Sequence, residues 1–228
     1  MMKSSRQQAS AIRKKRRVTG ITLVELLVVI VIVVILAGLA FPGGGGVQTK
    51  SGQAKDLSNA KQIGLGLRLY AADHNGVFPT SATSANAAYL HIVPDYVPTQ
   101  KIFWLANSVW STGSHAIEFS SSGTLAAGQN NYAYVSGLKD SDNANYPLIA
   151  DGFNEGVPGV YNSVQGTKGG VYKGRKAIVV RVDDSAAIES VGSDYRVHAN
   201  GANTDNSSVD IFTTGATWMP WARVLNPE

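Results

Sequence analysis

A long apolar run near the N-terminus constrains this chain more than any other feature. Residues 26–41 are sixteen consecutive apolar positions, counting glycine, and residues 21–24 extend the run with Glu25 as its main interruption. At about 1.5 Å per residue, a helix of this length spans roughly 30 Å, the thickness of the hydrocarbon core of a bilayer. The run therefore predicts a membrane helix over 21–42 with one carboxylate. A carboxylate in lipid costs up to about 2.5–3.5 kcal/mol at mid-membrane and less near the edge.

The charge of the chain is unevenly distributed. The 228 residues include 20 Lys and Arg against 16 Asp and Glu, but seven of the basic residues lie in the first twenty positions, which contain no acid. The remainder has 13 basic and 16 acidic residues, a net charge of −3. A basic block beside an apolar run is typical of a cytoplasmic flank. The folded part offers no basic stripe, so we expect no nucleic-acid partner.

Three interpretations of the N-terminal segment compete. A secretory signal peptide would have a basic start and a small-residue cleavage site, for which residues 38–40 are a candidate, but the apolar run is long for one. A plain single-pass anchor explains the length and leaves Glu25 unexplained. In a prepilin-type signal, a glycine ends a basic leader, a cut follows the glycine, and the apolar helix remains in the mature protein.

The residues around the start of the run are specific. Residues 17–27, RVTGITLVELL, resemble the signature of type IV pilins and type II secretion pseudopilins. In that family a membrane aspartyl peptidase cuts after the glycine and methylates the new N-terminal residue. The resemblance implies a cut between Gly20 and Ile21, N-methylation of Ile21, and Glu25 as the acid of the mature helix. Pro42 stands where the family tends to carry a helix-distorting proline.

Cleavage would give Glu25 a chemical partner. A freed amine on Ile21 is an ammonium, and an ammonium and a carboxylate attract strongly in a low dielectric although each alone is costly there. Pairing within one helix is open, and the family precedent favours pairing with the terminus of a neighbouring subunit. Either way, we interpret Glu25 as a device that favours assembly.

Four segments follow from this interpretation. Residues 1–20 are a cleaved basic leader, and residues 21–42 are the transmembrane and assembly helix. Residues 43–46 form a glycine-rich break after Pro42, with Gly43 and Gly44 at its start, because proline and glycine both disfavour a helix interior. This break is either a joint that can melt or a plain linker. The head, residues 47–228, begins with an amphipathic helix over 47–72, whose apolar positions recur every three or four residues.

The head reads as α+β. Short β-branched or aromatic segments predict an antiparallel sheet of four or five strands, and the adjacent Asp183 and Asp184 predict a hairpin turn between the third and fourth. A short helix or loop is expected at 84–92, and a further strand is open near 117–120. The expected fold is pilin-like: a long N-terminal helix, membrane-spanning in its first half, packed on this sheet. The strand candidates are residues 131–136, 146–150, 176–182, 187–191 and 209–213.

A few residues of the head are candidates for a functional role. Asp140, Asp142 and Asn145, together with Asp151, could hold calcium, as major pseudopilins of the type II system do in a C-terminal loop, although the spacing is not that of a standard calcium loop. The alternative is a solvated loop. The chain has no cysteine, which excludes disulfides and thiolate metal sites.

Two further features of the head, its histidines and its C-terminal tryptophans, are expected to have structural roles. The four histidines are not spaced as a metal pair, so His198 is not expected to be catalytic or a zinc ligand. Trp218 and Trp221 are expected to pack in the core, with a contact to a neighbouring subunit or a sugar as the alternative.

We therefore expect a structural subunit of a type II secretion pseudopilus-like filament, not an enzyme, with no cofactor unless calcium binds. The expected partners are a prepilin peptidase, identical or related pilin-like subunits, an inner-membrane assembly platform and membrane lipid. The expected location is the bacterial inner membrane, with a cytoplasmic N-terminus and a periplasmic head. The alternatives are a type IV pilus or minor pilin subunit, and a membrane-tethered binding module that uses a prepilin signal.

Overall fold

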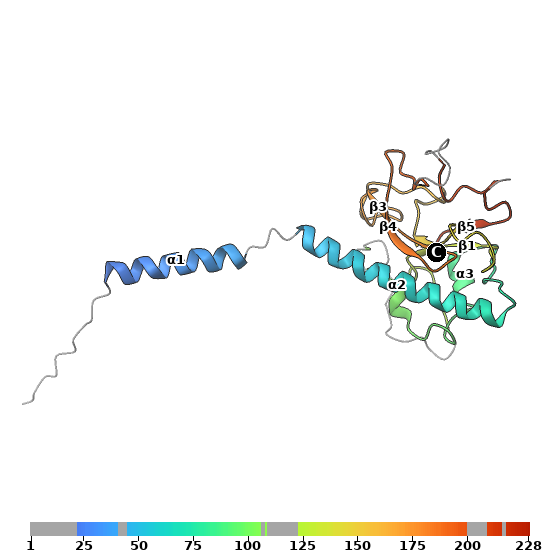
Figure 1. The fold of residues 1–228 in the computed structure, drawn as a ribbon, viewed down its shortest axis with the longest axis horizontal. Coiled ribbons are helices and arrows are strands. Elements are labelled where there is room, and N and C mark those ends of the chain that lie inside the picture. Colours follow the sequence, from blue (N-terminus) through green and yellow to red (C-terminus); the bar gives the residue numbers. More distant parts are fainter. Residues whose placement is uncertain (1–21, 41–44, 106–107, 109–122, 200–208, 216–217) are drawn as a thin grey trace, which may run out of the picture. The chain divides into compact units, whose positions relative to one another are not determined.

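A computed structural model describes residues 22–40, 45–105, 108, 123–199, 209–215 and 218–228 (Figure 1). The chain divides into two compact units, Met1–Gly44 and Gly45–Glu228, close to the predicted boundary at Gly46. The leader, the cleavage pair Gly20 and Ile21, and the residues Pro42, Gly43 and Gly44 lie outside the described residues. The strand considered near 117–120 lies outside them too.

The first unit contains one described helix, α1 (Leu23–Ala40). Within the described residues, no helix combines the length and the apolar character that crossing a bilayer requires. The predicted span over 21–42 also includes positions 21, 41 and 42, which lie outside this description. The membrane span is therefore not confirmed and stays a prediction.

The second unit begins with α2 (Gly45–Asp73), which starts two residues earlier than predicted. Gly45 and Gly46 of the predicted break are thus helical. The apolar face of α2 is fully buried and follows the predicted spacing of three and four. Its members are Ala60, Ile63, Leu67 and Ala71. The helix ends where predicted, because Gly76 takes a left-handed φ of 78° and donates its N–H to the Ala71 carbonyl at 2.8 Å.

The head sheet has five antiparallel strands in the order β4-β3-β2-β1-β5. The strands are β1 (Tyr132–Ser136), β2 (Pro147–Asp151), β3 (Lys176–Arg181), β4 (Ala186–Ser190) and β5 (Arg223–Leu225). The first four confirm the predicted strands to within one or two residues. Helix α2 packs on β2, β3 and β4, and the short helix α3 (Ala85–Tyr89) packs on β1 (Figure 1). The fold class is α+β, which is compatible with a pilin-like fold.

The fifth predicted strand, residues 209–213, is wrong. Asp210 makes only an isolated bridge with His198. Its side-chain Oδ1 accepts from the Phe212 N–H at 2.9 Å, and its carbonyl accepts from the Thr213 N–H at 3.1 Å. These local bonds turn the chain, as aspartate side chains often do. The fifth strand is instead β5, which pairs with β1 through Val224 opposite Val135.

The predicted hairpin turn is confirmed. The Arg181 N–H donates to the Ser185 carbonyl at 2.8 Å, and Asp184 takes a left-handed φ of 66°. The Asp183 Oδ1 accepts from the Ser185 N–H at 2.8 Å. The two acids therefore shape a turn between β3 and β4.

The burial of one face of α2 predicts that alanine substitutions at two leucines, two positions apart, will affect stability very differently. Leu67 is fully buried and Leu65 is 53% exposed. We expect Leu67→Ala to lower the free energy of unfolding by about 2–5 kcal/mol, because it leaves a cavity against the sheet. Leu65→Ala is the matched control and should change it by less than about 0.5 kcal/mol. Urea unfolding of the full chain in detergent, followed by tryptophan fluorescence, measures both. Equal losses would contradict this assignment of the helix face.

Candidate functional site

Thr22 and Glu25 form a capping box at the start of α1. The Glu25 Oε2 accepts from the Thr22 backbone N–H at 2.8 Å and from the Thr22 hydroxyl at 2.9 Å. In return the Glu25 N–H donates to the Thr22 Oγ1 at 3.2 Å. Reciprocal bonds of this kind satisfy the donors that a helix leaves unpaired at its first turn. The Thr-x-x-Glu pattern predicts this pairing, which our reading of the sequence missed.

This geometry places the carboxylate of Glu25 beside the N-terminal backbone of α1. The Thr22 nitrogen that it binds is one residue from the nitrogen of Ile21, which cleavage would turn into an amine. The positive end of the helix dipole further favours a carboxylate at this position. Glu25 is thus preorganised to face positive charge at the N-terminal end of the helix. Its pairing with the Ile21 amine stays a prediction, because Ile21 lies outside the described residues.

The apolar side chains described in α1 are largely exposed to solvent in a single chain. From Leu23, which is 80% exposed, to Val34, which is 69% exposed, every large apolar side chain is at least 47% exposed. An exposed apolar surface of this extent, interrupted only by Glu25 between residues 23 and 34, is unfavourable in water and marks a site of contact with lipid or protein.

The calcium candidates do not converge. Asp140, Asp142 and Asn145 lie in the loop between β1 and β2, where the Asp142 Oδ2 accepts from the Lys139 N–H at 2.7 Å. Asp151 stands at the other end of β2, about 13 Å of strand away from that loop. In the parts of the chain that the structure describes, no three His, Asp or Glu side chains are grouped as metal ligands. Calcium binding by the loop alone stays an untested prediction.

Asp151 is a core residue instead. Its Oδ1 accepts from the Ile178 N–H at 2.8 Å and from the Tyr161 hydroxyl at 3.3 Å. Its Oδ2 is buried and has no hydrogen-bond partner among the described residues. Burial raises the pKa of Asp151 to about 7, against the lowering effect of its hydrogen bonds, and the nearby charge of Asp56 adds to the rise.

Asp56 is a second buried acid, on α2. The Tyr172 hydroxyl donates to the Asp56 Oδ2 at 2.6 Å, and the Tyr132 hydroxyl donates to the Asp56 carbonyl at 2.8 Å. These bonds join α2 to the sheet and to the segment that precedes β3. Sequence reasoning did not single out Asp56. Its position four residues before Ala60, on the buried face of α2, is the signal that could have found it.

The two tryptophans have different environments. Trp218 packs edge-on against Tyr146, with ring centroids 4.7 Å apart, and its Nε1 donates to the Ile211 carbonyl at 2.8 Å. Trp221 is 69% exposed, so the expectation that it packs in the core is wrong. His198 contacts both carboxylate oxygens of Asp194 at 3.0 Å, which makes a histidine–carboxylate pair rather than a histidine pair for metal.

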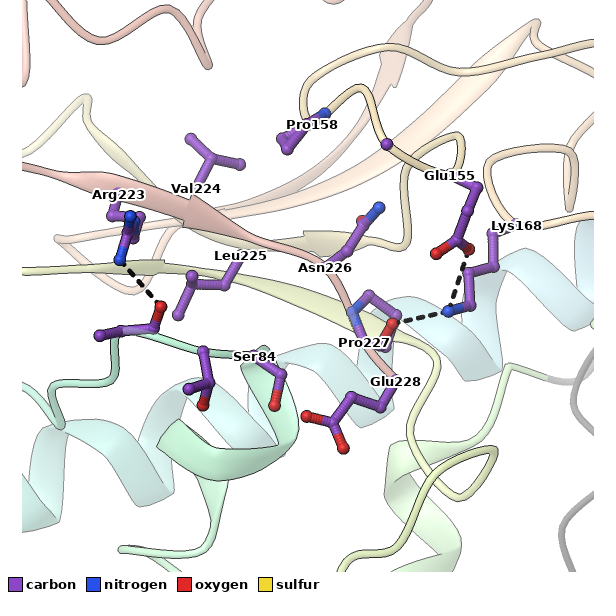
Figure 2. A pocket seen from close by; sticks show the side chains of 13 residues that line it. Ser84, Glu155, Pro158, Lys168, Arg223, Val224, Leu225, Asn226, Pro227 and Glu228 are labelled. Atoms are coloured by element: carbon purple, nitrogen blue, oxygen red, sulfur yellow. Dashed lines mark hydrogen bonds and ion pairs between the residues drawn. The ribbon is translucent and has the colours of Figure 1, made fainter.

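A hollow beside β5 contains several charged groups (Figure 2). The Lys168 ammonium lies 3.1 Å from the Glu155 carboxylate and donates to the Pro227 carbonyl at 2.9 Å. The Arg223 guanidinium donates to the Ala82 carbonyl at 2.8 Å, and the Ser84 Oγ accepts from the Ala87 N–H as the cap of α3. The bonds of Lys168 and Arg223 hold the C-terminal segment onto the head. Their contacts are structural.

Comparison with known families identifies a prokaryotic N-terminal methylation motif over residues 15–41. The motif contains Gly20, Ile21 and Glu25, and it is consistent with a prepilin-like signal. The match covers the start of the chain only and leaves the head unassigned. No curated protein and no solved structure matches the chain.

The variant Asp151→Asn tests the raised pKa of the buried acid through the pH dependence of stability. The pKa of Asp151 is 3.8 when unperturbed and about 7 in the fold. Its contribution to stability is therefore fully present below about pH 4 and is lost as the pH rises through about 7. At about 1.4 kcal/mol per pH unit, the free energy of unfolding of the wild type should fall relative to that of the variant by up to about 4 kcal/mol over this window. Urea unfolding at a series of pH values measures the difference.

Asp194→Asn controls for the sign of that effect. The hydrogen bond with His198 lowers the pKa of Asp194, so its contribution is lost as the pH falls. Parallel stability curves for the wild type and Asp151→Asn would contradict a raised pKa for the buried Asp151.

Proposed function

We propose that this chain is a structural subunit of a type II secretion pseudopilus-like filament, polymerised through α1 and not itself an enzyme. One observation carries the proposal: a methylation motif whose acid, Glu25, is held at the start of an otherwise apolar and exposed helix. A motif of this kind implies processing by a prepilin peptidase and pilin-like assembly.

Processing is the first step. The peptidase would hydrolyse the Gly20–Ile21 bond with one water, and would then transfer a methyl group from a sulfonium methyl donor to the new amine, which loses a proton. An α-amino group has a pKa of about 7.7–8.0 and is therefore largely protonated at neutral pH. Cleavage thus creates a positive charge close to the carboxylate of Glu25, where the uncleaved chain has a neutral amide.

Assembly is the second step. Before assembly, α1 would lie in the inner membrane, with the head in the periplasm. A carboxylate and an ammonium in lipid are stabilised by each other, so a subunit that docks its Glu25 against a neighbour's terminus gains more than apolar packing alone provides. Leu65 and Leu69 of α2 are also exposed, and their contact with a neighbouring subunit would add apolar packing between heads. An inner-membrane assembly platform would draw the subunits from the bilayer.

Two other assignments remain as alternatives. A type IV pilus or minor pilin subunit would use the same signal and helix, and the lack of cysteine favours the pseudopilin because type IV pilins often carry a C-terminal disulfide. A membrane-tethered binding module is favoured by the exposed ring of Trp221, a side chain that commonly binds sugars or proteins. A chain that is processed and yet stays monomeric in cells would support the binding module.

The processing step predicts one mature form. Protein isolated from the native host should begin at Ile21 and carry one added methyl group. Intact-mass spectrometry with N-terminal sequencing measures both features. A terminus near residue 41 would instead mean that the segment is a secretory signal peptide.

The assembly step predicts that multimer formation depends more on the charge of Glu25 than on its capping bonds with Thr22. Glu25→Gln should still be cleaved, yet it should lose multimers by tenfold or more, because it removes an ion pair worth more than about 1.4 kcal/mol in lipid. Thr22→Val is the matched control: it removes the hydroxyl partner and leaves the carboxylate, so most multimers should persist. Chemical crosslinking in cells and immunoblotting measure both. Wild-type multimers with Glu25→Gln would overturn the proposed role.

A further inference from the structure

Three basic residues lie together just before and at the start of β3. Lys173 and Arg175 are exposed, and Lys176 is half-buried. Lys173 and Arg175 line two neighbouring surface hollows, which continue to Tyr195 on one side and to Gln53 and Lys176 on the other. We call Lys173, Arg175 and Lys176 the basic patch.

Among the described residues, no acid forms an ion pair with the basic patch. Residues 163–176 contain no Asp or Glu. Among the described residues, the ion pairs lie elsewhere: Glu189 pairs with Arg181 at 2.6 Å, and Asp194 faces His198 at 3.0 Å. The Lys176 ammonium donates to the hydroxyl of Ser190 at 2.9 Å, which leaves its charge in place.

Apolar side chains accompany the basic patch. Val164 is 59% exposed and lies between Ser163 and Gln165, which line the two hollows. Tyr195 is 39% exposed, and its ring covers Gly174 so closely that a Cβ there would lie 2.7 Å from the ring. Basic side chains beside a tyrosine and an exposed aliphatic side chain are the combination found where proteins meet the lipid headgroup region.

The basic patch is also tied to the early part of α2. The Tyr172 hydroxyl, next to Lys173, bonds Asp56 at 2.6 Å. Asp56 is eleven residues from the start of α2 at Gly45, about 17 Å along the helix. Lys50 and Lys55 are exposed on the same stretch. The bond between Tyr172 and Asp56 therefore places the basic patch beside the first half of α2, the half that follows α1 in the chain.

We propose that the basic patch, with Val164 and Tyr195, binds anionic lipid headgroups of the membrane that holds α1, and so keeps the head of an unassembled subunit against the bilayer. The proposal rests on the proposed function in one respect, which is that α1 lies in lipid. Anionic lipid attracts each nearby Lys or Arg, and salt weakens the attraction. Because the head is tethered beside the surface, weak attraction suffices to hold it there. The alternative partner is an acidic surface on a second copy of the chain. Such a surface would pair with the basic charges, but it would not account for the exposed apolar side chain of Val164.

The experiment uses the full chain in nanodiscs that hold one chain each. The chain has no cysteine, so Val164→Cys carries a polarity-sensitive dye at a single position. The discs contain phosphatidylcholine alone or phosphatidylcholine mixed with phosphatidylglycerol. We expect a blue shift of the dye in the anionic discs only, which high salt reverses.

Charge variants locate the surface. Lys173→Glu with Arg175→Glu should abolish the blue shift, and the milder Lys173→Gln with Arg175→Gln should reduce the bound fraction about fivefold or more, the effect of roughly one basic side chain near an anionic surface. Lys101→Glu with Lys139→Glu makes the same charge change at two exposed positions outside the basic patch and should leave the shift intact. Unchanged circular dichroism shows that each variant is folded.

The outcomes separate the two proposals. An equal dye signal in neutral and anionic discs overturns the lipid proposal. In discs loaded with several chains, a shift that appears at either lipid charge and is absent from the one-chain discs also overturns it, in favour of contact between copies. Co-purification with neutral discs reports separately whether α1 inserts. If α1 does not insert, the proposed function fails, and a dye response to added phosphatidylglycerol vesicles still decides for or against the basic patch.

Discussion

The head depends on the burial of one face of α2 against the sheet. Ala60, Ile63, Leu67 and Ala71 are within 1% of complete burial, and α2 contacts β2, β3 and β4. Most of the stability of a helix in a protein comes from such packing rather than from its intrinsic propensity. The tyrosine bonds to Asp56 fix the orientation of this packing, because the buried carboxylate needs Tyr172 as its partner and the Asp56 carbonyl accepts from Tyr132. The same contact connects α2 to the segment that carries the basic patch.

Glu25 has two roles that follow from one position. In the uncleaved chain it caps α1 through Thr22, which satisfies backbone donors at the end of the helix. After cleavage the same carboxylate would face an ammonium, and the preference of the helix terminus for negative charge already favours that arrangement. A capped carboxylate has part of its hydrogen-bonding capacity satisfied within the chain. This lowers the cost of holding the acid in an apolar segment before a partner subunit arrives.

Local patterns predicted much of the head and failed where distant contacts decide. Strands β1 to β4 are recognisable because four β-branched or aromatic runs lie between Gly, Asp or Asn residues, and Asp183 with Asp184 marks their hairpin. Residues 209–213 have the same apolar character, yet the side chain of Asp210 bends the chain there. The three residues of β5 become a strand only because β1 offers an edge to pair with. Trp218 and Trp221 are only three residues apart, yet Trp218 packs against Tyr146 and Trp221 is 69% exposed.

The sequence by itself determined the processing motif, the position of Glu25, the apolar helix and where the first four strands lie along the chain. These features depend on residues close together in the chain, whose spacing is fixed by covalent geometry and helical or strand period. Only the tertiary structure decided that Asp151 is buried in the core, away from the other calcium candidates. It also decided that Asp56 bonds Tyr172, and that Tyr195 lies beside the basic patch. Each of these depends on residues 10 to 116 positions apart, and their proximity is set by packing, which no local pattern encodes.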